Sequence, residues 1–204
     1  MPAKDELLGI VIAGGRSLRF GGEKAVAPFA GRPLLLWAVD RLRTACGEVA
    51  VNARPGTEAE ALARAQGIAV IADAAGDPDG PLSGVKAGLN WARARGASSL
   101  AVSPCDAPLL PEDLYLRLRA AAGAGAAMAE TTGEGRQPLC AIWPAAALPR
   151  LTEALAGGAH PPTWRMLEEL GAVKVRFDRP EAFANLNTRE DLERLERQAA
   201  GYQR

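Results

Sequence analysis

The chain alternates short apolar runs rich in branched residues with longer amphipathic stretches, and this alternation constrains the fold more than any other feature of the sequence. The apolar runs predict strands that are buried on both faces. They span residues 8–13, 48–52, 68–72, 100–103 and 173–177, and the predicted helices span 34–43, 57–66, 83–95 and 112–122. This order predicts a Rossmann-like, mostly parallel sheet with helices on both faces, in a three-layer α/β/α fold of the α/β class. Such a sheet binds ligands at the carboxyl ends of its strands.

The alternation loosens after Gly123. Apolar stretches at 126–129 and 139–143 flank a polar turn and predict a hairpin-like excursion. Thr188 and Asp191 have the spacing of a capping box for a last helix, from Arg189 to about Gln198. The sequence has no internal repeat and no linker long enough to divide it, so we expect a single domain over residues 1–204.

Composition excludes several classes of partner. Lys plus Arg equals Asp plus Glu at 24 each, so no global positive field favours nucleic acid or an anionic membrane surface. The three cysteines have neither disulfide nor zinc-site spacing, which is typical of a reducing compartment. The first apolar stretch, 7–13, is too short for a secretion signal or a membrane span. We therefore expect a cytoplasmic protein.

A glycine-rich, cationic segment follows the first predicted strand. Residues 12–24 read Ile-Ala-Gly-Gly-Arg-Ser-Leu-Arg-Phe-Gly-Gly-Glu-Lys. At a carboxyl strand end, the backbone N–H groups of such a loop can approach a polyphosphate closely, and the cations can neutralise it. This predicts a phosphate-binding loop. The alternative is a flexible glycine loop with solvated arginines.

Two common phosphate motifs do not match this loop. The P-loop needs Gly-Lys followed by Ser or Thr, whereas Glu23 precedes Lys24 and Ala25 follows it. The pattern G-x-G-x-x-G is also missing, which disfavours a Rossmann oxidoreductase.

Asp106 ends the fourth predicted strand, between Pro104 and Pro108, which restrict the backbone. A carboxylate in this position can hold Mg²⁺ against triphosphate oxygens, because Mg²⁺ prefers one or two carboxylates together with phosphate and water. The alternative is a turn residue or a charge at a helix N-terminus.

Two weaker segments add to this pattern. At Gly80-Pro81-Leu82-Ser83-Gly84, small residues at a helix start allow a base or a ribose to lie against the backbone, with Ser83 as an N-cap, although an ordinary tight turn explains them equally well. Asn185 and Asn187 place two amides on the same side of an extended segment, where they can coordinate Mg²⁺ or contact a ligand.

Histidine and cysteine chemistry is not indicated. His160 is the only histidine and lies beside two prolines, which excludes a histidine triad or a multi-histidine metal site and favours a structural role. The charge of Asp106 disfavours a thiolate at Cys105, so no covalent mechanism is expected.

Taken together and in this order, these segments resemble the molybdenum cofactor guanylyltransferase (MobA-type) family of nucleotidyltransferases. The family's L-A-G-G-x-S-x-R-M-G-x-x-K matches residues 12–24, with Ile12 for Leu and Phe20 for Met. Its G-P-L-A-G, C-D-x-P and N-x-N-T-x-E-D-L match residues 80–84, 105–108 and 185–192, with Ser83 for Ala. The resemblance extends to Asn52, Asp73 and Gln137-Pro138-Leu139 and spans essentially the whole chain.

The resemblance implies a sheet of the nucleotide-diphospho-sugar transferase type and Mg²⁺-dependent transfer of GMP from GTP to the terminal phosphate of molybdopterin, or of the molybdenum cofactor, with release of pyrophosphate. Transient contacts with cofactor-delivering and cofactor-receiving proteins are expected with it. The expected nucleotide-site residues are Ile12, Ala13, Gly14, Gly15, Lys24, Asn52, Asp73, Gly80, Pro81, Asp106, Asn185 and Asn187. Lys24, Asp106 and Arg19 are the expected catalytic residues, with Asp106 as the metal ligand; Arg19 and Asn187 are our additions to the family's set.

The acceptor is already an ionised phosphate, so this reaction needs no protein base. Two alternatives stay open: a cytidylyl- or other nucleotidyltransferase of the same fold, and a non-catalytic nucleotide-binding regulator. The enzyme prediction requires Lys24 and Asp106 to converge on one triphosphate.

Overall fold

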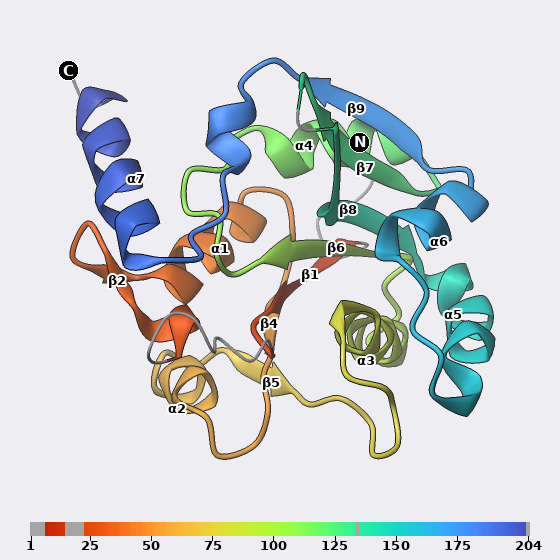
Figure 1. Cartoon of the computed structure of the whole chain (residues 1–204). Helices are drawn as coiled ribbons and strands as arrows, with labels where there is room; N and C mark the ends of the chain where they lie inside the picture. Colours follow the sequence, from red (N-terminus) through yellow and green to blue (C-terminus); the bar gives the residue numbers. More distant parts are fainter. Residues whose placement is uncertain (1–6, 15–22, 134, 203–204) are drawn as a thin grey trace.

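One seven-stranded sheet runs through the protein, from β5 at the bottom of Figure 1 to β9 at the top. The computed structural model describes residues 7–14, 23–133 and 135–202. In spatial order the strands are β5 (Ala69–Ile71), β4 (Val49–Asn52), β1 (Leu7–Ile12), β6 (Ser99–Pro104), β8 (Gly135–Pro144), β7 (Ala127–Thr131) and β9 (Val173–Phe177). Strand β8 runs antiparallel to both of its neighbours, and the other pairings are parallel. The predicted mostly parallel sheet is confirmed.

Helices cover both faces of this sheet because its central strands are apolar on both sides. In β1, Leu7 and Val11 pack in one core and Leu8 and Ile10 in another. The first core is closed by α1 (Leu34–Arg43), α2 (Glu58–Ala65) and α4 (Leu114–Ala122), and the second by α3 (Pro81–Ala94), α5 (Leu148–Leu155) and α6 (Thr163–Glu169). The three-layer α/β/α architecture is therefore confirmed (Figure 1).

A third, smaller core joins the C-terminal helix to a short hairpin. Phe29 of the hairpin β2 (Pro28–Phe29) and β3 (Arg32–Pro33) packs with Leu195 of α7 (Arg189–Tyr202). The turn of the hairpin is tied to α7 as well, because the N–H of Ala30 donates to Glu196 Oε1 at 2.9 Å. Segments from opposite ends of the chain thus lie side by side (Figure 1).

The predicted capping box at the start of α7 is confirmed. The N–H of Asp191 donates to Thr188 Oγ1 at 3.1 Å, and the N–H of Thr188 donates to Asp191 Oδ2 at 3.0 Å. These reciprocal bonds satisfy two backbone donors at the helix start.

Three expectations from the sequence are corrected. Strands β5 and β9 are not buried on both faces: β5 is half-buried and most of β9 is half-buried or exposed, because they form the two edges of the sheet. Ser83 is not an N-cap, since α3 begins at Pro81 after Gly80, and the Ser83 hydroxyl donates to the Pro78 carbonyl at 2.6 Å.

Two helices, α5 and α6, were not predicted at all. Leu148, Leu151 and Leu155 give α5 a buried apolar face at helical spacing, and α6 starts directly after Pro162, which restricts the chain before it. The described part of the chain contains no helix with the length and apolar character that a membrane crossing requires.

Candidate active site

A cavity of about 440 Å³ opens where β1, β4 and β6 end. Its walls come from the carboxyl ends of these strands, from the start of α3 and from the 3-10 helix η2 (Lys24–Val26). The lining residues are Ile12, Ala13, Gly14, Lys24, Ala25, Asn52, Arg54, Asp73, Asp79, Gly80, Pro81, Pro104, Cys105, Asp106 and Leu139. This is the strand edge at which an open α/β sheet binds its ligands.

Lys24 joins the two sides of the predicted phosphate site. Its Nζ lies 2.9 Å from Asp106 Oδ2 and 2.8 Å from Asn187 Oδ1. Asp106 follows β6, and the N–H of Leu186 donates to the Asp106 carbonyl at 2.8 Å, which holds the segment of Asn187 beside it. The predicted convergence of Lys24 and Asp106 is therefore present in the structure.

Asn52 is held at the inner wall of the cavity. Its Nδ2 donates to the Ile71 carbonyl at 3.1 Å and to Asp73 Oδ1 at 2.8 Å, and its side chain is almost fully buried. The amide oxygen consequently faces α3, where a Cβ on Gly84 would lie 2.4 Å from it. Gly84 is thus required for the close approach of α3 to Asn52.

His160 packs on the first turn of α3. Its Nε2 accepts the N–H of Leu82 at 3.2 Å, in keeping with the expected structural role. Gly80 has φ of +149°, and a Cβ there would lie 2.1 Å from the same nitrogen. Both its conformation and its neighbour therefore require glycine at this point of the cavity wall.

A family model for the MobA-like NTP transferase domain matches residues 9–173. A molybdenum cofactor guanylyltransferase of Cereibacter sphaeroides is 39% identical over 191 residues, which cover 93% of this chain and 95% of that protein. The chain belongs to the MobA-like NTP transferase family. The resemblance found in the sequence is confirmed, and so is the predicted class of enzyme, a nucleotidyltransferase of the molybdenum cofactor guanylyltransferase type.

Two solved structures have folds similar to that of this chain. Molybdopterin-guanine dinucleotide biosynthesis protein A from Archaeoglobus fulgidus superposes with a TM-score of 0.75 at 24% identity, over 95% of this chain and 99% of its own. The 4-diphosphocytidyl-2C-methyl-D-erythritol synthase from Anaerococcus prevotii superposes with a TM-score of 0.71 at 14% identity, over 97% and 96%. The fold predicted for this MobA-like chain, that of nucleotide-transferring enzymes, is thereby confirmed.

Most residues expected at the nucleotide site of this MobA-like domain lie together. Of the residues expected there, the cavity is lined by Ile12, Ala13, Gly14, Lys24, Asn52, Asp73, Gly80, Pro81 and Asp106. Asn187 reaches the site through Lys24, whereas Asn185 is exposed and does not line the cavity. Gly15 and Arg19 lie outside the described residues.

An ion pair at the cavity was not predicted from the sequence. Arg54 and Asp79 both line it, and Arg54 Nη2 lies 3.0 Å from Asp79 Oδ1. Each stands within two residues of a predicted site residue, Asn52 and Gly80, but neither belongs to a motif. Their pairing depends on how the segments after β4 and before α3 meet, which is a tertiary property.

The two cysteines nearest the site are not nucleophiles. Burial, with a smaller contribution from the charge of Asp106, raises the pKa of Cys105 to about 12. The same two causes raise the pKa of Cys140 well above its ordinary value. Both thiols are therefore protonated at neutral pH, as the sequence predicted for Cys105.

Proposed function

We propose that this cavity binds GTP and that the chain transfers GMP to the terminal phosphate of molybdopterin or of the molybdenum cofactor, with release of pyrophosphate. The observation that carries the proposal is the contact of Lys24 with Asp106 and Asn187 at the carboxyl edge of the sheet. A cation and two oxygen ligands meet there, in a cavity that Ala13 and Gly14 also line. This combination suits a triphosphate with its metal ion.

The donor set fits Mg²⁺. Among the described residues, no three His, Cys, Asp or Glu are grouped as a self-sufficient metal site. Asp106 and Asn187 nevertheless direct a carboxylate oxygen and an amide oxygen at one cation, the Lys24 ammonium. Asp106 would hold Mg²⁺, with Asn187 as a neighbouring oxygen, and the bound ion would neutralise charge on the triphosphate.

The remaining residues would bind the nucleotide and align the reacting phosphates. Lys24 places its ammonium on phosphate oxygens, where it offsets the charge that develops on the leaving pyrophosphate. Asn52 Nδ2 donates to Asp73 Oδ1 at 2.8 Å and so fixes a carboxylate that can accept a hydrogen bond from the ribose or the base. Gly80 and Pro81 offer a wall without a protruding side chain at Gly80, against which a flat ring can lie. The acceptor phosphate is already ionised when it attacks the α-phosphorus, so the reaction needs alignment of the two phosphates and no catalytic base.

The test is a reaction of the purified protein with Mg²⁺, molybdopterin and each of GTP, CTP, ATP and UTP in competition. Pyrophosphate release and the mass of the dinucleotide product are measured. We expect release with GTP and a product carrying GMP. A product carrying CMP would instead identify a cytidylyltransferase, and nucleotide binding without turnover would identify a regulator.

A further inference from the structure

Glu23, the residue immediately before Lys24, binds the start of helix α2. Its Oε2 accepts the N–H of Glu58 at 2.6 Å, and its Oε1 accepts the N–H of Ala59 at 3.1 Å. These are the first two residues of α2, whose N–H groups have no partner within the helix. A carboxylate is also favoured there by the positive end of the helix dipole.

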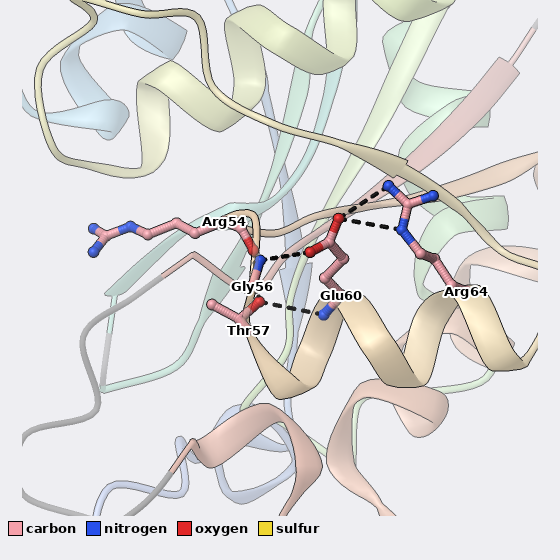
Figure 2. A network of polar contacts seen from close by, with 5 residues as sticks. All are labelled: Arg54, Gly56, Thr57, Glu60 and Arg64. Atoms are coloured by element: carbon pink, nitrogen blue, oxygen red, sulfur yellow. Dashed lines mark hydrogen bonds and ion pairs between the residues drawn. The ribbon is translucent and has the colours of Figure 1, made fainter.

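The rest of the α2 start is capped by residues of the same segment. Thr57 Oγ1 accepts the N–H of Glu60 at 3.3 Å, and Glu60 Oε2 accepts the N–H of Gly56 at 2.6 Å (Figure 2). The Thr57 hydroxyl itself donates to the Arg54 carbonyl at 2.7 Å. The helix start thus has a local cap, while Glu23 supplies a contact from 35 residues away along the chain.

Glu23 and Lys24 direct their side chains to different parts of the molecule. The backbone of Glu23 is extended, with φ of −76° and ψ of 108°, and neighbouring side chains of extended backbone point to opposite sides. One carboxylate accordingly reaches α2, while the next ammonium reaches Asp106 and Asn187. Helix α2 thus holds the chain at Glu23, the residue directly before Lys24.

We infer that Glu23 is a positioning residue that anchors the end of the phosphate loop to α2 and so keeps Lys24 directed at Asp106. The kinetic part of this inference rests on the proposed function. The competing role for Glu23 is stabilisation of α2 alone. Glu60 provides the control, because its carboxylate binds the same helix start, and among the described residues its side-chain partners are Gly56 and Arg64, both of the α2 segment.

Hydrogen exchange tests the anchoring without any substrate. The N–H groups of Val26 and Ala27 donate to the carbonyls of Glu23 and Lys24. In Glu23→Ala we expect hydrogen exchange at residues 26 and 27 to accelerate about five- to tenfold, which corresponds to the free energy that the loss of a helix cap usually costs. In Glu60→Ala we expect acceleration only at residues 56–60. Unchanged exchange at 26 and 27 in Glu23→Ala, with the protein folded, would overturn the inference.

Kinetics test the consequence for Lys24. In Glu23→Ala we expect kcat for GMP transfer to fall about ten- to a hundredfold, the usual cost of a misplaced catalytic group, whereas Glu60→Ala keeps kcat within about twofold. Both variants should lose a similar few degrees of Tm. Glu23→Gln should recover part of kcat, since its amide oxygen still accepts one N–H. If Glu23→Ala and Glu60→Ala had equal kcat values, Glu23 would be a helix cap only. If the wild-type protein were inactive, the proposed function would be refuted, and the hydrogen-exchange comparison would still test the anchoring.

Discussion

Lys24 and Asp106 are separated by 82 residues in the sequence and by 2.9 Å in space. Their side chains are 14% and 21% exposed, so both reach the cavity while most of their surface is packed. Partial burial strengthens their electrostatic effect on a bound phosphate relative to the same charges in water. The two residues therefore form the part of the site at which single substitutions are most informative.

We expect Lys24→Ala and Asp106→Ala each to lower kcat for GMP transfer by roughly two to four decades, because each removes a preorganised charge from the reacting phosphates. Steady-state pyrophosphate release measures this. Lys174→Ala is the control, since Lys174 on β9 pairs with Glu168 at 3.0 Å and does not line the cavity. A folded Lys24→Ala or Asp106→Ala enzyme with near-normal kcat would exclude that residue from the catalytic machinery.

Gly84 tests the packing behind the site. In Gly84→Ala the new Cβ would lie 2.4 Å from Asn52 Oδ1, and Asn52 is held by two hydrogen bonds, so it cannot turn away without losing them. We expect a loss of about 1–3 kcal/mol in the free energy of unfolding, measured by denaturant titration. Gly125→Ala is the control, because the nearest atom to its Cβ, the Ala122 carbonyl oxygen, would be 3.4 Å away. Equal stability of the two variants would contradict this account.

At the scale of elements, helix α7 carries Asn187 to the site. Asn187 stands two residues before the helix, and its N–H donates to Asp191 Oδ2 at 3.0 Å, so the cap of α7 also orients the asparagine. The far part of the helix is fixed to the hairpin of β2 and β3 through Leu195 and Glu196. The C-terminal helix is consequently part of the site's framework, although the matched family model ends at residue 173.

Asp191 gives this cap a defined pH dependence. Hydrogen bonds from Arg194, from the backbone of Asn187 and from Thr188 lower the pKa of Asp191 from 3.8 to about 2. A lowered folded-state pKa means that the stabilisation is complete well above pH 3.8 and is lost as the pH falls toward 2. We expect wild-type protein to exceed Asp191→Asn in Tm at pH 7 and this difference to shrink between about pH 4 and pH 2. A difference that stays constant over that range would show that the charge of Asp191 does not stabilise the cap.

At the scale of the whole molecule, the fold does not decide which nucleotide is used. The A. fulgidus protein and the A. prevotii synthase both superpose on this chain over most of their length. In open α/β sheets the parallel strands place their carboxyl ends at one edge, which is where this class of fold binds its ligands. We therefore expect the choice of nucleotide to depend on the residues that line the cavity.

The sequence by itself determined the layers of the fold, the central strands, most helices and the family to which the motifs belong. It could do so because the spacing of apolar residues, helix caps and strand-end motifs are local signals. The tertiary structure decided which strands form the edges, since burial at β5 and β9 depends on their place at the ends of the sheet formed by the described residues and not on their own side chains. It also decided the contacts of Glu23 with α2 and of Arg54 with Asp79. These join segments distant in the chain, and such contacts arise from packing geometry that no local pattern encodes.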